Sequence, residues 1–458
     1  MAFDKKSVLL FNPWICDFAA YDFWFKPLGL LSVGAVLRAQ GYDVQLVDCL
    51  DRFHPALLNV PIRQKTTIRP DHSGKFHREI IRKPDVLNSV PRHYARYGMP
   101  YDLVERTLGS LRRPDIVLVT SFMTYWYPAV VDAILLLRKC FPEAKIILGG
   151  IYASLCAEHA RTCAAPDYII TGEGEVKAVR LIAELLNGPG RDYHYRKLDD
   201  LPMPAFDLYP CLNSVALLTS RGCPNACSFC ASGILASGYR RRSVANVVDE
   251  IRFWRLHNQV RHFAFYDDAL LHRSSQFIKP ILRQVQENGW AINFYTPNGL
   301  TPRYIDAEMA ALFFTANVRH ICLSFETSND ERQKAMSAKV TNSELIEALN
   351  NLERAGYERR DIGVYVLMGL PGQSVDEVRH SAAFVHRLGA RVRVASFSPI
   401  PGTLEWQKAV DLDLWQLNAD PLLTNSSIFP IWSSTIGYQH CLDLLLWIKS
   451  LNDQLLKE

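Results

Sequence analysis

Residues 219–230 of the chain read TSRGCPNACSFC, and they place Cys223, Cys227 and Cys230 at C-x3-C-x2-C spacing. This run follows an apolar, strand-like segment at 215–218, and a glycine and a proline shape a tight loop around the first cysteine. Iron–sulfur clusters are held by cysteine thiolates, usually four of them. Three thiolates on one loop therefore predict a cubane [4Fe–4S] cluster whose fourth iron is open to another ligand. Structural zinc or chance clustering is the alternative, but zinc prefers four ligands in two separated pairs, and the sequence has no second C-x2-C or H-x3-H pair.

The spacing of the three cysteines resembles the cluster loop of the radical SAM enzymes. In that family the free iron chelates the amino and carboxylate groups of S-adenosylmethionine (SAM). An electron from the cluster then splits the sulfonium to give a 5′-deoxyadenosyl radical. The resemblance implies that Cys223, Cys227 and Cys230 are metal ligands, that the cofactors are a 4Fe-4S cluster and SAM, and that Phe229 lies beside the adenine. A core aromatic is the alternative for Phe229.

Length and composition fit a globular protein of two domains. The chain has 458 residues, 48% hydrophobic and 21% charged, with a formal net charge of +4 that is too small to imply nucleic acid. A run of about 18 apolar residues, the length of a membrane-spanning helix, does not occur. The first residues lead into a strand rather than a signal-peptide core. Together with the free thiols, this pattern predicts a reducing, cytoplasmic location and no membrane partner.

The first part of the chain, residues 1–190, alternates short apolar strands with amphipathic helices. Such alternation predicts a Rossmann-like parallel sheet covered on both faces, with ligands bound beyond the carboxyl ends of its strands. The strands are predicted at Ser7–Asn12, Asp43–Asp48, Asp115–Thr120, Lys145–Leu148 and Asp167–Thr171, and the helices at Leu28–Gln40, Pro128–Cys140 and Glu175–Leu186.

The order of these strands, with Ser121-Phe122-Met123 and then Gly149-Gly150, resembles the cobalamin-binding domain attached to many radical SAM proteins. Many such domains carry D-x-H-x-x-G, whose histidine ligates cobalt, but here Asp71-His72-Ser73-Gly74 has the wrong spacing and place. A domain that kept the fold and lost cobalamin is the alternative. The resemblance implies cobalamin as a cofactor, bound by Pro13, Ser121, Gly149, Gly150, Gly172 and Glu173.

Two further segments stand out in this half. Residues 50–113 interrupt the sheet pattern and are rich in arginine and lysine, which fits either a basic lid over an acidic ligand or a solvated surface insertion. Residues 191–212 contain several prolines and are predicted to be a stiff linker between the two domains.

Six strand–helix repeats over residues 213–403 predict an open (β/α)6 partial TIM barrel, whose active site lies at the carboxyl ends of its strands. A helical extension at 404–458 is predicted to cap the barrel mouth, pack on its side or form a dimer surface. The strands are predicted at Val215–Thr219, His262–Tyr266, Asn293–Thr296, His320–Phe325, Gly363–Met368 and Arg393–Phe397, and the helices at Val244–His257, Ser275–Asn288, Asn342–Ala355, Val375–Leu388 and Gln439–Leu456.

Polar or glycine residues follow most of these strands, and their order resembles the SAM site of the radical SAM family. A helix cap is the alternative for the two aspartates after the second strand, and a surface salt bridge is the alternative for the arginine after the fourth. The resemblance implies SAM contacts from Asp267, Asp268, Asn298, Glu326, Arg332, Gly369 and Pro371.

The sequence therefore predicts a cobalamin-dependent radical SAM enzyme that acts on an unactivated carbon of a small molecule. Methyl transfer is the first expectation, and an electron donor such as flavodoxin or ferredoxin is the expected partner. Cyclisation, rearrangement or oxidation without methyl transfer is the runner-up, because fold and cofactors do not fix the product. A non-catalytic cobalamin or redox sensor is a different class of function. A methylthiotransferase would need a second cluster, for which Cys16 and Cys49 lack a convincing third ligand.

Overall fold

The computed structural model describes residues 5–59 and 68–457, and it divides into two compact units. Unit 1 comprises Met1–Val215 with Pro421–Leu423, and unit 2 comprises Ala216–Asp420 with Thr424–Glu458. None of the helices in the described residues combines the length and the apolar character that a membrane crossing requires.

Unit 1 is built on a five-stranded sheet in the order β3-β1-β6-β7-β8. Its strands are β1 (Ser7–Asn12), β3 (Asp43–Asp48), β6 (Ile116–Val119), β7 (Lys145–Leu148) and β8 (Tyr168–Ile169). Each neighbouring pair runs parallel. The predicted Rossmann-like sheet is therefore confirmed, and β1, β3 and β7 begin and end at the predicted residues.

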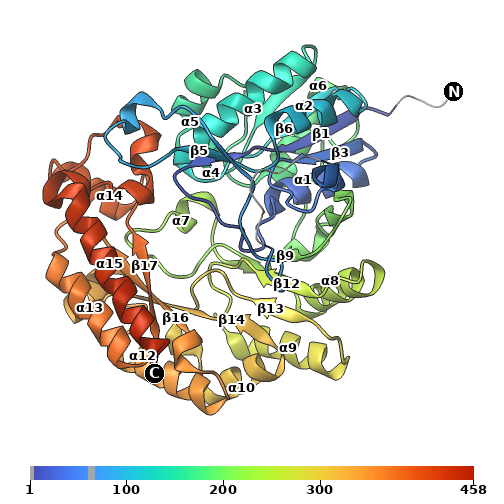
Figure 1. The fold of residues 1–458 in the computed structure, drawn as a ribbon. Helices are drawn as coiled ribbons and strands as arrows, with labels where there is room; N and C mark the ends of the chain where they lie inside the picture. Colours follow the sequence, from blue (N-terminus) through green and yellow to red (C-terminus); the bar gives the residue numbers. More distant parts are fainter. Residues whose placement is uncertain (1–4, 60–67, 458) are drawn as a thin grey trace. The chain divides into compact units, whose positions relative to one another are not determined.

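Helices pack on this sheet, as Figure 1 shows. Helices α1 (Leu28–Ala39) and α6 (Gly174–Leu185) share one apolar core, in which Val36 and Val179 are fully buried. Burial of such side chains stabilises the unit by about 2 kcal/mol each. The other helices of this unit are α2 (Tyr101–Ser110), α3 (Tyr127–Cys140), α4 (Ile151–Leu155) and α5 (Ala157–His159).

The predicted interruption at 50–113 contains regular structure that the sequence pattern did not predict. Strands β4 (Arg78–Ile80) and β5 (Ala95–Tyr97) form a small antiparallel sheet with β2 (Ile15–Asp17), and helix α2 follows them. Arg96 on β5 is only 15% exposed and pairs with Asp132 at 2.7 Å. At least this basic side chain is built into unit 1 rather than left in solvent; residues 60–67 of the interruption lie outside the described part.

Among the described residues of unit 2, the barrel is formed by seven short strands in two sheets. One has the order β14-β13-β12-β9 and the other has the order β15-β16-β17. A parallel bridge from Leu300 to Leu323 joins the β13 side to β15. The strands are β9 (Val215–Leu217), β12 (His262–Phe265), β13 (Asn293–Tyr295), β14 (Val318–His320), β15 (Cys322–Glu326), β16 (Gly363–Met368) and β17 (Arg391–Ser396), with the small hairpin β10 (Ser220–Arg221) and β11 (Arg240–Arg241).

One predicted strand is wrong in detail. The segment predicted as a single strand at His320–Phe325 is divided between β14, which pairs with β13, and β15, which pairs with β16. Both pairings also shift register, so the strand ladder is irregular in this part of the barrel. The chain therefore passes from one sheet of the barrel to the other within the predicted fourth strand.

Helices cover the outside of these strands (Figure 1). The last of them, α15 (Tyr438–Leu455), lies on the side of the barrel, where the Asn452 side chain bonds both the N–H and the C=O of Val392 on β17, each at 2.9 Å. An asparagine thus takes the place of a neighbouring strand at this edge. The remaining helices are α7 (Ser232–Leu235), α8 (Val244–His257), α9 (Ile278–Glu287), α10 (Ala307–Thr315), α11 (Asp330–Met336), α12 (Asn342–Arg354), α13 (Val375–Arg387) and α14 (Leu404–Asp411).

Candidate functional site

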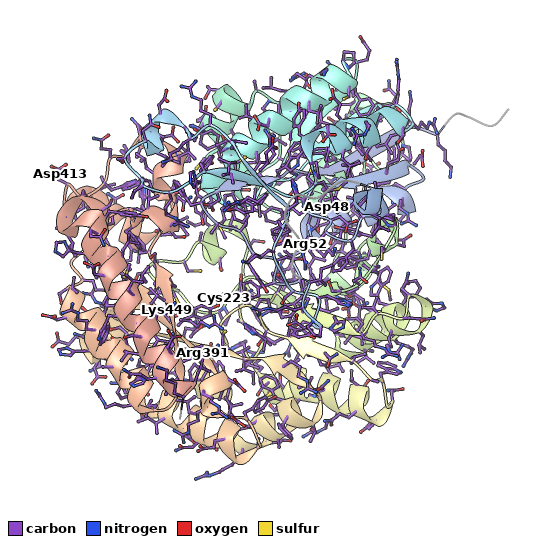
Figure 2. The ribbon with its side chains drawn as sticks, viewed as in Figure 1. Asp48, Arg52, Cys223, Arg391, Asp413 and Lys449 are labelled. Atoms are coloured by element: carbon purple, nitrogen blue, oxygen red, sulfur yellow. The ribbon has the colours of Figure 1, made fainter. Side chains whose placement is uncertain are left out.

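The three cysteines of the cluster loop lie between β10 and α7 of unit 2, and Figure 2 marks Cys223. The Cys223 and Cys227 side chains are half-buried and Cys230 is exposed. The Sγ atom of Cys230 accepts a weak hydrogen bond from the backbone N–H of Ser232 at 3.4 Å. The loop therefore presents three thiols that are at least partly accessible.

Asp267 fixes the strand end from which the loop begins. Its buried carboxylate accepts hydrogen bonds from the backbone N–H of Thr219 at 3.1 Å, from the Thr219 hydroxyl at 2.7 Å and from the Ser220 hydroxyl at 2.6 Å. Burial raises the pKa of Asp267, and these hydrogen bonds oppose that rise. The prediction that Asp267 binds SAM stays a prediction; in the structure its carboxylate positions the cluster loop.

Glu405 and Met336 hold the middle of the same loop. The hydroxyl of Ser228, between the second and third cysteines, donates to the Glu405 carboxylate at 3.0 Å, and the N–H of Glu405 donates to the Ser228 carbonyl at 3.0 Å. The N–H of Ser228 donates to the carbonyl of Met336 at 2.9 Å. Because Glu405 lies on α14, the C-terminal extension positions the loop as well as covering the barrel.

Lys339 is the cation of this site. Its ammonium lies 3.6 Å from the Glu326 carboxylate, and the two side chains are 14% and 12% exposed. Burial alone would lower the pKa of Lys339, but the nearby charges of Glu326 and of the three cysteines outweigh burial and raise it. Burial likewise raises the pKa of Cys223 and Cys227, and Lys339 opposes that rise. Lys339 therefore favours thiolates at the loop.

Glu326 is held in an unusual backbone conformation at the end of β15. Its φ of 71° is in the left-handed region, where residues other than glycine are strained. The pairing of β15 with β16 shifts register just before Glu326. Burial raises its pKa, which Lys339 opposes. Its Oε2 atom is buried without a hydrogen-bond partner, so one acceptor of the site is still open.

These side chains fit a [4Fe–4S] cluster with SAM beside it. Three thiols are the donors that such a cluster takes, Lys339 offsets part of their negative charge, and the open oxygen of Glu326 offers an acceptor to a donor group of SAM. Among the described residues, no three histidine, cysteine or acidic side chains are grouped closely enough to hold a single metal ion. A cubane needs a wider arrangement, because each thiolate binds a different iron.

Asp268 and Asn298 lie next to this group. Asp268 is exposed, and its charge contributes to the raised pKa of Cys223 behind the larger effect of burial. The Asn298 amide donates to the carbonyls of Tyr266 at 2.9 Å and Asp267 at 3.3 Å, which fastens the end of β12. Asp268 is thus the more accessible of the two aspartates.

The other predicted SAM residues follow the neighbouring strands. Arg332 donates to Glu377 at 2.6 Å and to the Gly372 carbonyl at 3.1 Å, an ion pair that is mostly buried. The N–H of Gly369 (φ 96°) donates to the Gln373 side chain at 2.9 Å. Pro371 in that turn is buried and Phe229 is half-buried. Their contacts with SAM stay predictions.

In unit 1 the structure brings Ser121 and the paired glycines together. The Ser121 hydroxyl donates to the Gly149 carbonyl at 2.7 Å, and the N–H of Ile151 donates to the Ser121 carbonyl at 2.8 Å. A Cβ at Gly150 (φ 98°) would lie 2.2 Å from the Ser121 carbonyl oxygen, so only glycine fits there. A Cβ at Gly149 would meet its nearest atom at 3.7 Å, which leaves that backbone open to a ligand.

Ser154 extends this rim to Gly172. Its hydroxyl donates to the Gly150 carbonyl at 2.7 Å and accepts from the Gly172 N–H at 2.8 Å. Glu173, next in the chain, accepts from the Tyr195 hydroxyl at 3.1 Å. Pro13 follows β1. The strand order reverses at β1, which lies between β3 and β6, and ligands of such sheets bind at this topological switch point. Open glycine backbone at this rim fits a large cofactor such as cobalamin.

Sequence reasoning missed three residues of these sites, namely Lys339, Glu405 and Ser154. Each lies outside every recognised motif, and Lys339 and Glu405 are distant in sequence from the cluster loop. Ser154 had one signal, because it lies within the first turn of the helix that follows Gly149-Gly150. The other two had none.

Comparison with known proteins gives one family and a set of relatives. Residues 217–385 match the family model of the radical SAM superfamily. An uncharacterised methyltransferase of Pyrococcus horikoshii is 23% identical over 347 residues, 68% of this chain and 74% of that protein. The cytidylyl-2-hydroxyethylphosphonate methyltransferase of Streptomyces wedmorensis is 24% identical over 476 aligned positions, 87% of this chain and 80% of that protein.

The fold is shared with a solved structure across both units. The radical SAM methyltransferase TsrM of Kitasatospora setae, solved with cobalamin and a [4Fe–4S] cluster bound, aligns with a TM-score of 0.64 over 89% of this chain and 78% of TsrM, at 17% identity. This likeness confirms the predicted fold class, a Rossmann-like sheet followed by a partial barrel. The match over residues 217–385 identifies that part of the chain as a radical SAM domain.

Proposed function

We propose that this radical SAM enzyme is a cobalamin-dependent methyltransferase that acts on an unactivated carbon of a small molecule. The observation that carries the proposal is the pairing of two built sites in one chain. Unit 2 has three thiols beside Lys339 and Glu326, and unit 1 has the hydrogen-bonded rim of Ser121, Gly149 and Gly150. Two relatives that align over more than two thirds of both chains are methyltransferases, whereas three cyclase relatives align over less of their own length, and this favours methyl transfer over cyclisation.

The protein's own residues bind, orient and balance charge in this proposal. Cys223, Cys227 and Cys230 would hold the cluster, which when bound supplies the electron that cleaves SAM. Asp267, which follows β12, keeps the loop in place, while Lys339 offsets part of the charge of the thiolates. The proposed contacts of SAM are Phe229, Asp268, Asn298, Glu326, Arg332, Gly369 and Pro371.

The rim of unit 1 would hold cobalamin. Gly149 and Gly172 expose backbone to which the cofactor can approach closely, and Pro13, Ser121, Gly150 and Glu173 complete the proposed contacts. The division into a cobalamin-binding domain at 1–190, a linker at 191–212, a barrel at 213–403 and an extension at 404–458 belongs to the same proposal. So do a cytoplasmic location and an electron donor of the flavodoxin or ferredoxin type.

Anaerobic reconstitution tests the proposal. The protein is loaded with iron and sulfide, mixed with hydroxocobalamin and passed through a desalting column. A retained corrin absorbance is expected, and with dithionite and SAM the loaded protein is expected to release S-adenosylhomocysteine, the product that methyl transfer leaves. Protein that keeps iron but no corrin, and that releases 5′-deoxyadenosine alone, would move the function to cyclisation, rearrangement or oxidation.

A further inference from the structure

The turn that runs from the end of α11 to Lys339 supplies polar groups to the cluster loop. The Met336 carbonyl accepts from the N–H of Ser228, which lies between the second and third cysteines, at 2.9 Å. Burial raises the pKa of the Cys227 thiol, and a side-chain hydrogen bond with Ser337 and the charge of Lys339 oppose that rise. One short turn therefore reaches the loop with a backbone carbonyl, a hydroxyl and an ammonium.

The shape of this turn is fixed by hydrogen bonds on both sides of a strained residue. Ala338 has a φ of 50°, in the left-handed region, where residues other than glycine are strained. The Gln333 carbonyl accepts from the N–H of Ser337 at 3.2 Å and from the N–H of Ala338 at 2.8 Å. Arg303 donates to the Ala338 carbonyl at 2.9 Å. The backbone positions from which Ser337 and Lys339 extend are thus set by contacts outside the cluster loop.

Lys339 keeps its charge inside the site rather than in solvent. Its side chain is 14% exposed, and its ammonium lies 3.6 Å from the carboxylate of Glu326. A buried charge is screened by water and salt much less than an exposed one, so Lys339 acts on the thiolates more strongly than a surface lysine would. Lys334, on the preceding helix α11, is such a surface lysine.

Charges and hydrogen bonds at the sulfur ligands help to set the reduction potential of an iron–sulfur cluster. Reduction adds one electron from a low-potential one-electron donor, and no bond to the protein forms or breaks. The added negative charge is stabilised by an ammonium and by a hydroxyl that donates to a ligating sulfur, and a carboxylate opposes it. Ser337 and Lys339 therefore favour the reduced state, and Glu326 disfavours it.

We propose that Ser337 and Lys339 raise the reduction potential of the [4Fe–4S] cluster and that Glu326 lowers it. Ser337 and Lys339 are positioning residues in this proposal, because they act through the sulfur ligands. The proposal rests on the cluster held by the three cysteines of the loop, and it depends neither on cobalamin nor on methyl transfer.

Midpoint potentials of the anaerobically reconstituted, full-length protein without SAM test the proposal. The protein is titrated with dithionite at one fixed pH, and the reduced cluster is followed by electron paramagnetic resonance. Ser337→Ala is expected to lower the equilibrium constant for reduction about tenfold, which is about 59 mV for a one-electron couple. Ser343→Ala, at an exposed position on α12, is the matched control and should keep the wild-type potential.

The charge of Lys339 is tested in a background that leaves no carboxylate stranded. Glu326→Gln should raise the potential above that of the wild type. Adding Lys339→Met to this variant should lower the equilibrium constant for reduction at least about tenfold, or about 59 mV. Lys334→Met removes an exposed lysine of α11 and should leave the potential unchanged. Loss of local structure does not predict these opposite signs.

Three results would each overturn the proposal. They are a wild-type potential in Ser337→Ala, equal potentials in Glu326→Gln and the double variant, and a shift in Lys334→Met as large as that caused by Lys339→Met. Iron content is measured in every sample. Ser337→Ala removes one oxygen from a half-buried side chain and should load iron as the wild type does, so it decides the proposal even if the double variant loads none. Failure of the cluster assignment is seen separately, as wild-type protein that gives no signal of a reduced cluster.

Discussion

The ammonium of Lys339 lies 3.6 Å from the carboxylate of Glu326, and both side chains are largely buried beside the cluster loop. Breaking a buried ion pair by removing one partner is costly, because the other charge stays buried without compensation. The two residues come from different parts of the chain, the end of β15 and the segment after α11. Their ion pair connects the end of β15 with the lysine whose charge acts on the three thiols.

Lys339→Met is expected to destabilise the protein by roughly 3 kcal/mol, as breaking a buried pair does. Urea unfolding followed by tryptophan fluorescence measures the change. Adding Glu326→Gln removes the stranded charge and should recover most of the loss. Lys334→Met, at an exposed position on α11, is the control and should change stability little. A double variant as unstable as Lys339→Met would contradict the pairing.

Asp267 and Asp268 are adjacent, but substitutions at the two positions are expected to have different effects. Asp267→Ala removes the acceptor of the hydrogen bonds from Thr219 and Ser220, each worth about 1.5–3 kcal/mol when the acceptor is charged. Low iron content after reconstitution and a lower melting temperature should follow. Asp268→Asn should keep its iron and instead weaken SAM binding, measured by equilibrium dialysis. Equal iron loss in the two variants would argue against the division of roles.

Gly149 and Gly150 provide a matched pair in unit 1. Gly150→Ala places a Cβ 2.2 Å from the Ser121 carbonyl oxygen and should greatly destabilise the unit. Gly149→Ala meets nothing closer than 3.7 Å and should leave the melting temperature unchanged. If cobalamin approaches this backbone, Gly149→Ala should still weaken hydroxocobalamin binding by about tenfold, or about 1.4 kcal/mol. Unchanged affinity would place the cofactor elsewhere.

Cysteine labelling reports which thiols the cluster covers. Burial raises the pKa of Cys16 to about 12 and of Cys156 and Cys441 to about 11, so at pH 8 they are protonated and should react slowly with iodoacetamide, faster as the pH approaches those values. Exposed Cys230 should react in the apoprotein and become protected after reconstitution. Exposed Cys163 should react in both, which makes it the internal control. Equal labelling of Cys230 with and without iron would argue against its role as a ligand.

The regular elements were predictable where burial alone decides them. β1 is an apolar run between Ser7 and Asn12, and β7 is an apolar run between Lys145 and the two glycines that follow Leu148, so their bounds could be read from the sequence. The strands β4 and β5 have three residues each, and β4 is largely exposed, which leaves too short and too polar a pattern to recognise. The division of the fourth barrel strand depends on which neighbour each half pairs with, and that is a tertiary property.

The candidate sites divide in the same way. The three cysteines and Gly149-Gly150 were found because their chemistry requires a fixed local spacing. Lys339 and Glu405 act on the loop across 109 and 177 residues of chain, counted from Cys230 to Lys339 and from Ser228 to Glu405, and no local pattern marks them.

The most direct test of the account measures 5′-deoxyadenosine in the anaerobically reconstituted protein after addition of dithionite and SAM. Wild-type protein should form it, and variants with alanine at Cys223, Cys227 or Cys230 should not. Wild-type protein that binds four irons yet leaves SAM intact, or a cysteine variant that still cleaves it, would contradict the assignment of this loop as the site of SAM cleavage.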